Sequence, residues 1–277
     1  MSISKLLKNS TDILKSAGIL SAEIDARILL EFASGKSREF LLAHPEYELS
    51  DIEVDDLSKL VARRKLHEPI AYITGHKEFF GLDFLLTPDV LIPRPETELL
   101  VEKCLDFLQT SNHKPQTVLD IGSGSGNIII SIATNCNLPT AIFFASDVSK
   151  KALIVARKNA NNHQVKIEFI QSNLFEKISG KFDLIVANLP YVPIDGSSDR
   201  EIKHEPQTAI FADNNGEMII KNFLSEAKNF LADGGQILIE VDPRNAKSLA
   251  RSATKDFENI EILKDYSGKN RFIRISN

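Results

Sequence analysis

One stretch constrains the fold of this chain more than any other, because it joins a strand pattern, a glycine turn and a helix pattern without a break. Val118–Ile121 is apolar enough for a buried strand, and glycines follow at Gly122, Gly124 and Gly126. Ile128–Ala133 then has the apolar spacing of a helix. Glycine lets the backbone come close to a ligand, and a helix start offers free N–H groups. The stretch predicts a site for a nucleotide-like ligand.

The same turn departs from the dinucleotide-binding fingerprint. That fingerprint places a third glycine three positions after Gly124, and this chain has Asn127 there. A nicotinamide-dependent dehydrogenase therefore fits imperfectly. A different adenosine-bearing cofactor is expected.

Composition narrows the class of protein. The chain has 277 residues, 43% of them hydrophobic and 26% charged, which is typical of a globular protein of one large or two modest domains. The net charge of −5 argues against a surface that grips nucleic acid mainly through phosphates. Cys104 and Cys136 lack metal or redox spacing, so we expect reduced thiols and no metal site. No run approaches the roughly 18 apolar residues of a membrane span, and we expect a cytoplasmic protein without membrane contact.

The first 75 residues predict a small bundle of four short helices. Their expected positions are 6–19, 24–32, 37–42 and 54–67. The last helix carries a basic cluster, Lys59, Arg63, Arg64 and Lys65, expected on its outer side as a solvated face or a surface for a partner.

Residues 76–92 predict a β-hairpin linker with its turn near Gly81. Two prolines then flank Arg94 and force an extended, stiff backbone ahead of the glycine turn. Arg94 and Glu96 could line a site there. The alternative is a stiff linker whose carboxylate caps the following helix.

Strand and helix patterns alternate from residue 117 onward, which predicts an α/β fold with a seven-stranded, mostly parallel, doubly wound sheet over residues 93–277. The last two strands lack a long helix between them and can pair antiparallel at one edge. Expected strands are 118–121, 141–146, 167–171, 184–187, 236–241, 260–263 and 272–275. Expected helices are 127–135, 149–163, 217–232 and 243–253.

Polar residues follow the second and third of these strands, where ligands of such sheets bind. Asp147, with Val148 beside it, could accept hydrogen bonds from ribose hydroxyls; it could also cap the helix near Ser149, and both roles can coexist. Asn173 could bond an adenine edge with Leu174 against the ring face, and a plain turn role for Asn173 is nearly as good.

The fourth strand ends in Asn188–Tyr191, which reads Asn-Leu-Pro-Tyr. A polar residue at the end of a buried strand is costly unless something binds it. The Asn188 oxygen and nearby backbone carbonyls could accept both hydrogens of an NH₂ group, with Tyr191 on its planar face. An ordinary strand-exit turn is the alternative.

Two of these motifs resemble those of class I S-adenosylmethionine-dependent methyltransferases. Asp120–Gly126 resembles their motif I, and Asn188–Tyr191 is similar to their Asn-Pro-Pro-Tyr motif, which marks methylation of a planar nitrogen. Leu91–Glu98, behind a helical N-terminal domain, resembles one branch, the release factor glutamine methyltransferases of the HemK/PrmC family. This resemblance covers nearly the whole chain, including Glu205-Pro206.

The resemblance implies a Rossmann-like methyltransferase that uses S-adenosylmethionine and yields S-adenosylhomocysteine. It implies methylation of a glutamine side-chain amide in the Gly-Gly-Gln motif of peptide chain release factors, with residues 1–75 as a substrate-recognition domain and no direct nucleic-acid contact. The residues carried over to cofactor binding are Asp120, Gly122, Ser123, Gly124, Ser125, Gly126, Asp147, Val148, Asn173, Leu174 and Asn188. Those carried over to catalysis are Asn188, Pro190 and Tyr191, and those to substrate binding are the same three with Leu189, Arg94 and Glu96.

Two positions depart from the family pattern, and other functions stay open. Leu189 stands where the family has proline, and Glu240–Pro243 replaces its Glu-x-Gly stretch. Asn-Leu-Pro-Tyr is also how the motif reads in rRNA adenine-N6 dimethyltransferases, so adenine-N6 methylation of RNA or DNA is the alternative. A non-catalytic protein that keeps the cofactor fold is a third interpretation.

Overall fold

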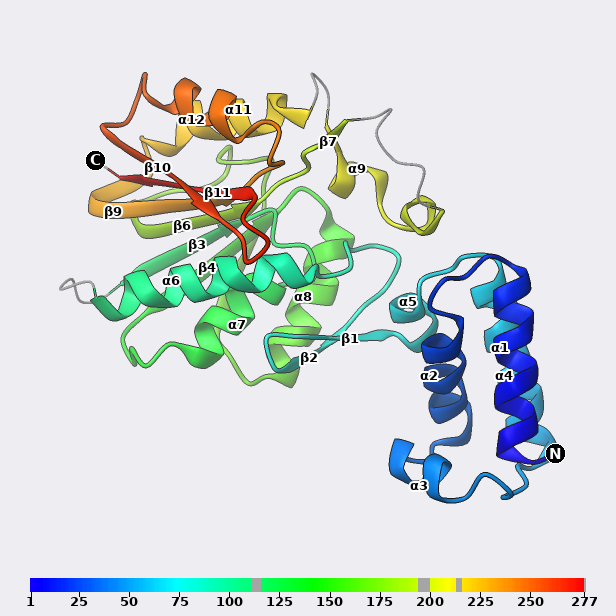
Figure 1. Cartoon of the computed structure of the whole chain (residues 1–277). Helices are drawn as coiled ribbons and strands as arrows, with labels where there is room; N and C mark the ends of the chain where they lie inside the picture. Colours follow the sequence, from blue (N-terminus) through cyan, green and yellow to red (C-terminus); the bar gives the residue numbers. More distant parts are fainter. Residues whose placement is uncertain (111–115, 194–199, 213–215, 277) are drawn as a thin grey trace. The chain divides into compact units, whose positions relative to one another are not determined.

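The computed structural model describes residues 1–110, 116–193, 200–212 and 216–276, and it contains two compact units (Figure 1). The first comprises residues 1–76 and the segment 199–204, and the second comprises 77–198 and 205–277. Each unit is described on its own. The hairpin that the sequence suggests as a linker clusters with the second unit.

The first unit is helical. Its helices are α1 (Ile3–Ser16), α2 (Ala22–Ser34), α3 (Arg38–Ala43), α4 (Asp51–Lys65), α5 (Ile70–Thr74) and the 3-10 turn η2 (Glu201–His204). Helix α4 begins three residues earlier than the apolar pattern suggests, because Ser50 and Glu53 form a capping box. Helix α5 has five residues, too few to show an apolar period. Within the described ranges, no helix is both long and apolar enough to cross a lipid bilayer.

One residue of the basic cluster on α4 is not on the outer side, and that prediction is wrong for it. Arg64 is 3% exposed, with its Nε 2.7 Å from Asp25 Oδ2 and its Nη2 2.6 Å from Glu201 Oε1. A buried guanidinium requires paired carboxylates. The apolar pattern could not reveal this because the carboxylates come from distant parts of the sequence.

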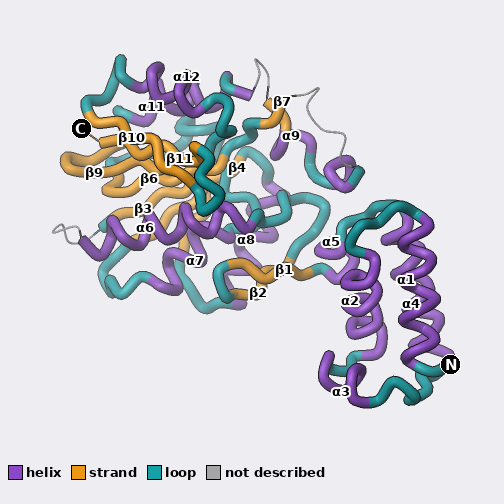
Figure 2. The backbone as a smooth tube through the Cα atoms, in the orientation of Figure 1, coloured by secondary structure: helices purple, strands orange, loops and turns teal. Residues whose placement is uncertain are grey.

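The predicted seven-stranded sheet forms the centre of the second unit (Figures 1 and 2). Its strands are β3 (Thr117–Ile121), β4 (Ile142–Asp147), β5 (Ile167–Gln171), β6 (Phe182–Asn188), β9 (Leu231–Glu240), β10 (Asn259–Lys264) and β11 (Asn270–Ser276). The order is β10-β11-β9-β6-β3-β4-β5, and within the described residues the antiparallel pairings of this sheet are those of β11 with β10 and with β9. The chain order reverses between β3 and β6. The fold class predicted from the sequence is therefore confirmed.

Helices cover both faces of this sheet (Figure 1). One face carries α6 (Glu98–Thr110), α7 (Asn127–Asn135) and α8 (Lys150–Asn162), and the other carries α11 (Met218–Ala227) and α12 (Ala246–Ala253). The buried core between the sheet and the second layer includes Ile185, Ile237 and Phe223. Shorter elements without a sequence signal are η1 (Pro95–Thr97), α9 (Gln207–Ile210), β7 (Val192–Pro193) and β8 (Phe211–Ala212).

The predicted helix 217–232 is too long at its C-terminal end. Helix α11 ends at Ala227, and β9 begins at Leu231, which pairs with Phe182 of β6. The strand then passes through Gly235, where an added Cβ would lie 3.0 Å from the Asp183 carbonyl oxygen. Because glycines interrupt the apolar alternation, the sequence pattern conceals the first half of this strand.

The hairpin of β1 (His76–Phe79) and β2 (Leu82–Leu85) is tied to α8 through a fully buried amide. Asn159 accepts from Leu85 N at 2.9 Å and donates to Leu85 O at 3.0 Å and to Ser125 O at 2.9 Å. One side chain thus joins the hairpin to the glycine turn.

We expect Asn159→Ala to lower the free energy of unfolding by about 2–4 kcal/mol, because it leaves one buried and two partly buried backbone groups without this partner. Urea unfolding followed by circular dichroism measures this. Asn161→Ala, an exposed asparagine on the same helix, is the matched control and should change stability by less than about 0.5 kcal/mol. Equal effects of the two variants would contradict the prediction.

Candidate active site

A cavity of about 230 Å³ lies at the carboxyl ends of β3, β4, β5 and β6, beside the point where the strand order reverses. Among its walls are predicted site residues from each of these strand ends. They are Gly122, Gly124, Asp147, Val148, Asn173, Leu174, Asn188, Leu189 and Pro190. Further wall residues come from Pro88–Leu91 and from Pro206, Thr208 and Ala209. The sheet topology thus collects residues that are far apart in sequence.

The glycine turn needs glycine for two different reasons. Gly122 has φ +78°, and an added Cβ would lie 2.9 Å from Leu189 Cδ2. Gly124 has φ +54°, a backbone conformation that favours glycine. Nothing lies within 4 Å of an added Cβ, so the space beside Gly124 is open. The turn therefore presents backbone to the cavity, as a nucleotide-like ligand requires.

Each carboxylate oxygen of Asp147 accepts a hydrogen bond from a backbone N–H group. Oδ2 accepts from Gly124 at 2.9 Å and Oδ1 from Ser149 at 2.8 Å. The cap of α8 is the Ser149 side chain, which accepts from Ala152 N, so Asp147 is not the helix cap. Burial raises the pKa of Asp147, and the two N–H groups oppose that rise. Each oxygen keeps a lone pair that can accept a hydroxyl.

Asp120 lies below this turn, is fully buried and does not line the cavity. Within the described residues no side chain is hydrogen-bonded to its carboxyl group, and the backbone N–H of Ile129 favours its ionised form. Burial, reinforced by the charge of Asp147, raises its pKa to about 8. A carboxyl with this pKa is mostly protonated at neutral pH, so Asp120 adds no full negative charge to the site. Ser123 and Ser125 are also buried beneath the turn rather than on the cavity wall.

The turn after β5 is strained and lines the cavity. Asn173 donates from Nδ2 to Glu176 Oε1 at 2.8 Å, so its side chain has the turn role that the sequence left open. Leu174 has φ +45°, a conformation that a branched side chain adopts at a cost. Val148, which also lines the cavity, is 60% exposed. Two apolar side chains thus face the space where a planar ring could bind.

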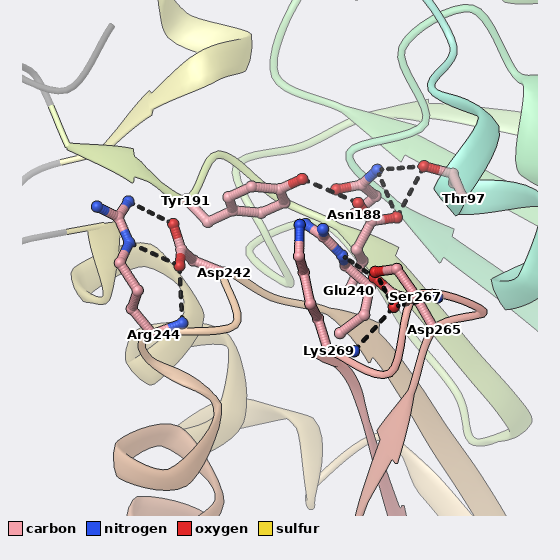
Figure 3. A network of polar contacts seen from close by, with 10 residues as sticks. Thr97, Asn188, Tyr191, Glu240, Asp242, Arg244, Asp265, Ser267 and Lys269 are labelled. Carbon is pink, nitrogen blue, oxygen red and sulfur yellow. Dashed lines mark hydrogen bonds and ion pairs between the residues drawn. The ribbon is translucent and has the colours of Figure 1, made fainter.

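Asn188 belongs to a buried polar network (Figure 3). Its Nδ2 lies 3.2 Å from Thr97 Oγ1 and 3.2 Å from Glu240 Oε2. Thr97 donates its hydroxyl to the same Glu240 oxygen at 2.7 Å, and Tyr191 donates to Glu240 Oε1 at 2.9 Å. Burial raises the pKa of Glu240, opposed by the hydrogen bonds from Thr97 and Tyr191 and by the charge of Arg271.

Tyr191, Arg94 and Glu96, predicted for catalysis or substrate binding, also do not line the cavity, and neither does Gly126 of the glycine turn. Tyr191 points its hydroxyl to Glu240. Arg94 Nη2 lies 2.6 Å from Glu205 Oε1, and the charge of Glu96 acts on Glu240. Arg94 therefore holds a buried carboxylate that precedes the wall residue Pro206, rather than facing the cavity itself.

Four further residues position this site although the sequence reading gave them no role. Glu240 and Thr97 hold Asn188, and Glu205 accepts from both Arg94 and Ile92 N. Gly216 packs so closely that an added Cβ would lie 1.9 Å from the Tyr191 carbonyl oxygen. Thr97 and Glu205 lie in segments that carry the family resemblance, and Glu240 directly follows the apolar run Ile237–Ile239. Gly216 had no signal in the sequence.

Comparisons with known proteins give the family context. A PrmC N-terminal domain matches residues 5–75, and a methyltransferase domain matches residues 112–275. The release factor glutamine methyltransferase of Aliivibrio fischeri is 38% identical over 98% of this chain and 96% of its own. That of Deinococcus radiodurans is 35% identical over 99% of this chain and 98% of its own. The chain spans 58% of the length of a bifunctional methyltransferase from Rickettsia felis, with 34% identity.

Solved structures support the fold alone. A methyltransferase from Pyrococcus furiosus has a TM-score of 0.52 at 20% identity, covering 79% of this chain and 97% of that one. A 16S rRNA N2 G1207 methyltransferase from Thermus thermophilus, in complex with AdoMet and guanosine, has a TM-score of 0.55 at 18% identity, covering 73% of this chain and 49% of that one.

Proposed function

Because this chain belongs to the release factor glutamine methyltransferase family, we propose that it moves a methyl group from S-adenosylmethionine to a glutamine side-chain amide nitrogen. The acceptor we propose is the Gln of the Gly-Gly-Gln motif in a peptide chain release factor. The observation that carries this is the common wall: Asn188, Leu189 and Pro190 line the same cavity as Gly124 and Asp147.

The chain's own residues make the acceptor nitrogen reactive by positioning it. An amide nitrogen is a poor nucleophile because its lone pair is delocalised into the carbonyl. Asn188 Oδ1 and the Leu189 carbonyl would accept its two N–H groups, which holds the nitrogen in place and stabilises the positive charge that develops on it. The nitrogen–carbon bond forms as the carbon–sulfur bond breaks, and the proton then leaves the nitrogen to water. No strong general base is needed.

The residues around this cavity support S-adenosylmethionine as its ligand, which would supply an electrophilic methyl group. The open space before Gly124 admits a ligand, and Asp147 has lone pairs left for two ribose hydroxyls. Asn173, Leu174 and Val148 would surround the adenine.

Adenine-N6 methylation is not favoured. The relatives that match nearly the whole chain are named glutamine methyltransferases, and residues 5–75 match a PrmC N-terminal domain. The net charge of −5 also opposes a phosphate-binding surface.

The assay that tests the proposal offers the protein methyl-labelled S-adenosylmethionine with a release factor, with the same factor carrying Gln→Ala in Gly-Gly-Gln, and with rRNA. Label should enter the intact release factor only, and mass spectrometry should place one methyl group on that glutamine. Label in rRNA, or in the Gln→Ala factor, would overturn the proposal.

Asp147→Ala should weaken S-adenosylhomocysteine binding by about 1.5–3 kcal/mol, because hydrogen bonds to a charged group are lost. Calorimetry measures this directly. Asp89→Ala is the matched control, since Asp89 is a carboxylate on the same cavity wall whose partner is Lys151. If both variants bind alike, the ribose role of Asp147 is wrong.

We also propose that the first unit recognises the release factor through an apolar face of α2. Ile24 and Phe32 lie eight residues apart, hence on one side of the helix, and both are exposed, as is the preceding Leu20. Exposed apolar side chains that cluster on one face are typical of protein-binding surfaces.

The double variant Ile24→Glu, Phe32→Glu should raise KM for an intact release factor at least about tenfold, since apolar anchors dominate such interfaces. Its kcat and its affinity for S-adenosylhomocysteine should stay unchanged. Ile52→Glu, an exposed isoleucine on α4, is the control. A tenfold rise in KM for that variant as well would exclude the α2 face as the specific docking surface.

A further inference from the structure

We propose that Glu240 and Thr97 are positioning residues that fix the orientation of the Asn188 side-chain amide, so that its oxygen and not its nitrogen meets the acceptor. This rests on the proposed function of Asn188 as the residue that holds the acceptor nitrogen. The reaction needs the Asn188 oxygen at this position, because the NH₂ group of the glutamine donates hydrogen bonds and requires an acceptor. An asparagine amide can turn over and present NH₂ instead, and the two forms differ only in their hydrogen bonds.

The fold brings the three residues together by strand register. Asn188 ends β6 and Glu240 ends the adjacent parallel strand β9, and the two are register partners. Parallel partners project their side chains to the same face of the sheet. Thr97 comes from η1, ahead of α6, and is 1% exposed. Figure 3 shows both oxygen-bearing side chains converging on the Asn188 nitrogen.

Counting hydrogens selects one orientation. The Asn188 nitrogen has two hydrogens and two acceptors, Thr97 Oγ1 and Glu240 Oε2, each at 3.2 Å. The single Thr97 hydroxyl hydrogen is already donated to Glu240 at 2.7 Å. If the amide turned over, its oxygen would face two oxygens that share one hydrogen, and the Thr97 hydroxyl could donate to it only by giving up its bond to Glu240. The flipped form would thus make fewer hydrogen bonds and would leave the amide oxygen against the Glu240 carboxylate oxygen.

This selection requires Glu240 to be an ionised, acceptor-only carboxylate. All three of its neighbours can donate to it: Thr97, Asn188 and Tyr191. Burial raises the pKa of Glu240, and the hydrogen bonds from Thr97 and Tyr191 and the charge of Arg271 oppose that rise and favour the ionised form. Within the described residues, no donor is bonded to Asn188 Oδ1, so that oxygen is available to the acceptor. The network thus leaves Oδ1 as the group that faces the cavity.

The experiment compares wild type, Glu240→Gln, Thr97→Val and Thr97→Ser, using release factor as the acceptor. Glutamine can donate where Glu240 accepts, so both orientations of Asn188 become possible. Valine keeps the shape of Thr97 without its hydroxyl, whereas serine keeps the hydroxyl. We expect kcat to fall about 10- to 100-fold in Glu240→Gln and Thr97→Val and to recover to within about threefold in Thr97→Ser. S-adenosylhomocysteine affinity should stay within about twofold in all four.

A second measurement does not depend on turnover. In the free, ¹⁵N-labelled protein, the Asn188 side-chain NH₂ signal, assigned by its loss in Asn188→Asp, should exchange with water about tenfold faster in Glu240→Gln than in wild type. Wild-type exchange and kcat in Glu240→Gln would overturn the inference. So would a fall in kcat that is the same in Thr97→Ser and Thr97→Val, because the hydroxyl would then be irrelevant. An inactive wild type would instead refute the proposed function, while the exchange measurement would still decide the orientation.

Discussion

Asn188→Ala is expected to reduce kcat for methylation of the release factor by about 10²–10³-fold, the usual effect of removing one preorganised hydrogen-bonding group at a reacting centre. The substitution removes Oδ1, the acceptor for the glutamine N–H, and leaves the Leu189 carbonyl as the remaining acceptor. Single-turnover transfer of a labelled methyl group measures the effect. Asn188 also lines the cofactor cavity, so binding of S-adenosylhomocysteine must be measured in the same variant.

The affinity for S-adenosylhomocysteine should change less than about fivefold in Asn188→Ala, because Asp147 and the glycine turn carry most of the binding. Asn188→Asp separates shape from hydrogen bonding. It preserves the volume but places a second carboxylate 3.2 Å from Glu240, where like charges repel. We expect Asn188→Asp to have a kcat as low as that of Asn188→Ala. A kcat near wild type in either variant would remove Asn188 from its proposed role.

Local sequence patterns predicted the central elements of this fold because each of those elements is determined by its own residues. The strand β3, the turn Gly122–Gly126 and helix α7 are consecutive in sequence, so period and glycine spacing suffice to place them. The carboxyl ends of parallel strands meet at one edge of a sheet, and this alone brings Asp147 and Asn188 to one cavity.

The polar network around Asn188 could not be predicted in this way. Thr97 and Glu240 reach Asn188 from 91 and 52 residues away in sequence. Their meeting depends on the register of β6 against β9 and on the path of η1, neither of which leaves a periodic signal. The same holds for Arg64 of α4, whose burial depends on Asp25 and Glu201. Patterns of apolar spacing cannot predict contacts between polar residues that are far apart in the sequence.

Leu189 shows how a departure from the family motif is accommodated. A proline at this position would fix φ, and leucine does not. The leucine side chain is 5% exposed and belongs to the same core as Ile185 and Phe223. It also fills the space directly beside Gly122. Side-chain packing against the glycine turn thus restrains the loop in place of the proline ring.

Gly216→Ala is expected to reduce kcat at least about 100-fold and to destabilise the protein by about 2–4 kcal/mol. The added Cβ would lie 1.9 Å from the Tyr191 carbonyl oxygen and 2.7 Å from its carbonyl carbon. Those atoms are backbone, so no side chain can turn away to relieve the clash. The backbone at Gly216 or at Tyr191 therefore has to shift. Tyr191 directly follows Leu189 and Pro190, and a shift of about 1 Å there is enough to misplace an acceptor. Turnover and urea unfolding of the same preparation measure both effects.

Gly180→Ala separates this clash from backbone strain. Gly180 has φ +94°, close to the +84° of Gly216, but nothing lies within 4 Å of an added Cβ. It should cost only the left-handed strain of about 1–2 kcal/mol and leave kcat unchanged. The difference between the two variants then reports the contact with Tyr191 alone. If Gly216→Ala keeps wild-type kcat at the same loss of stability as Gly180→Ala, the loop tolerates displacement and the position of Asn188 does not depend on it.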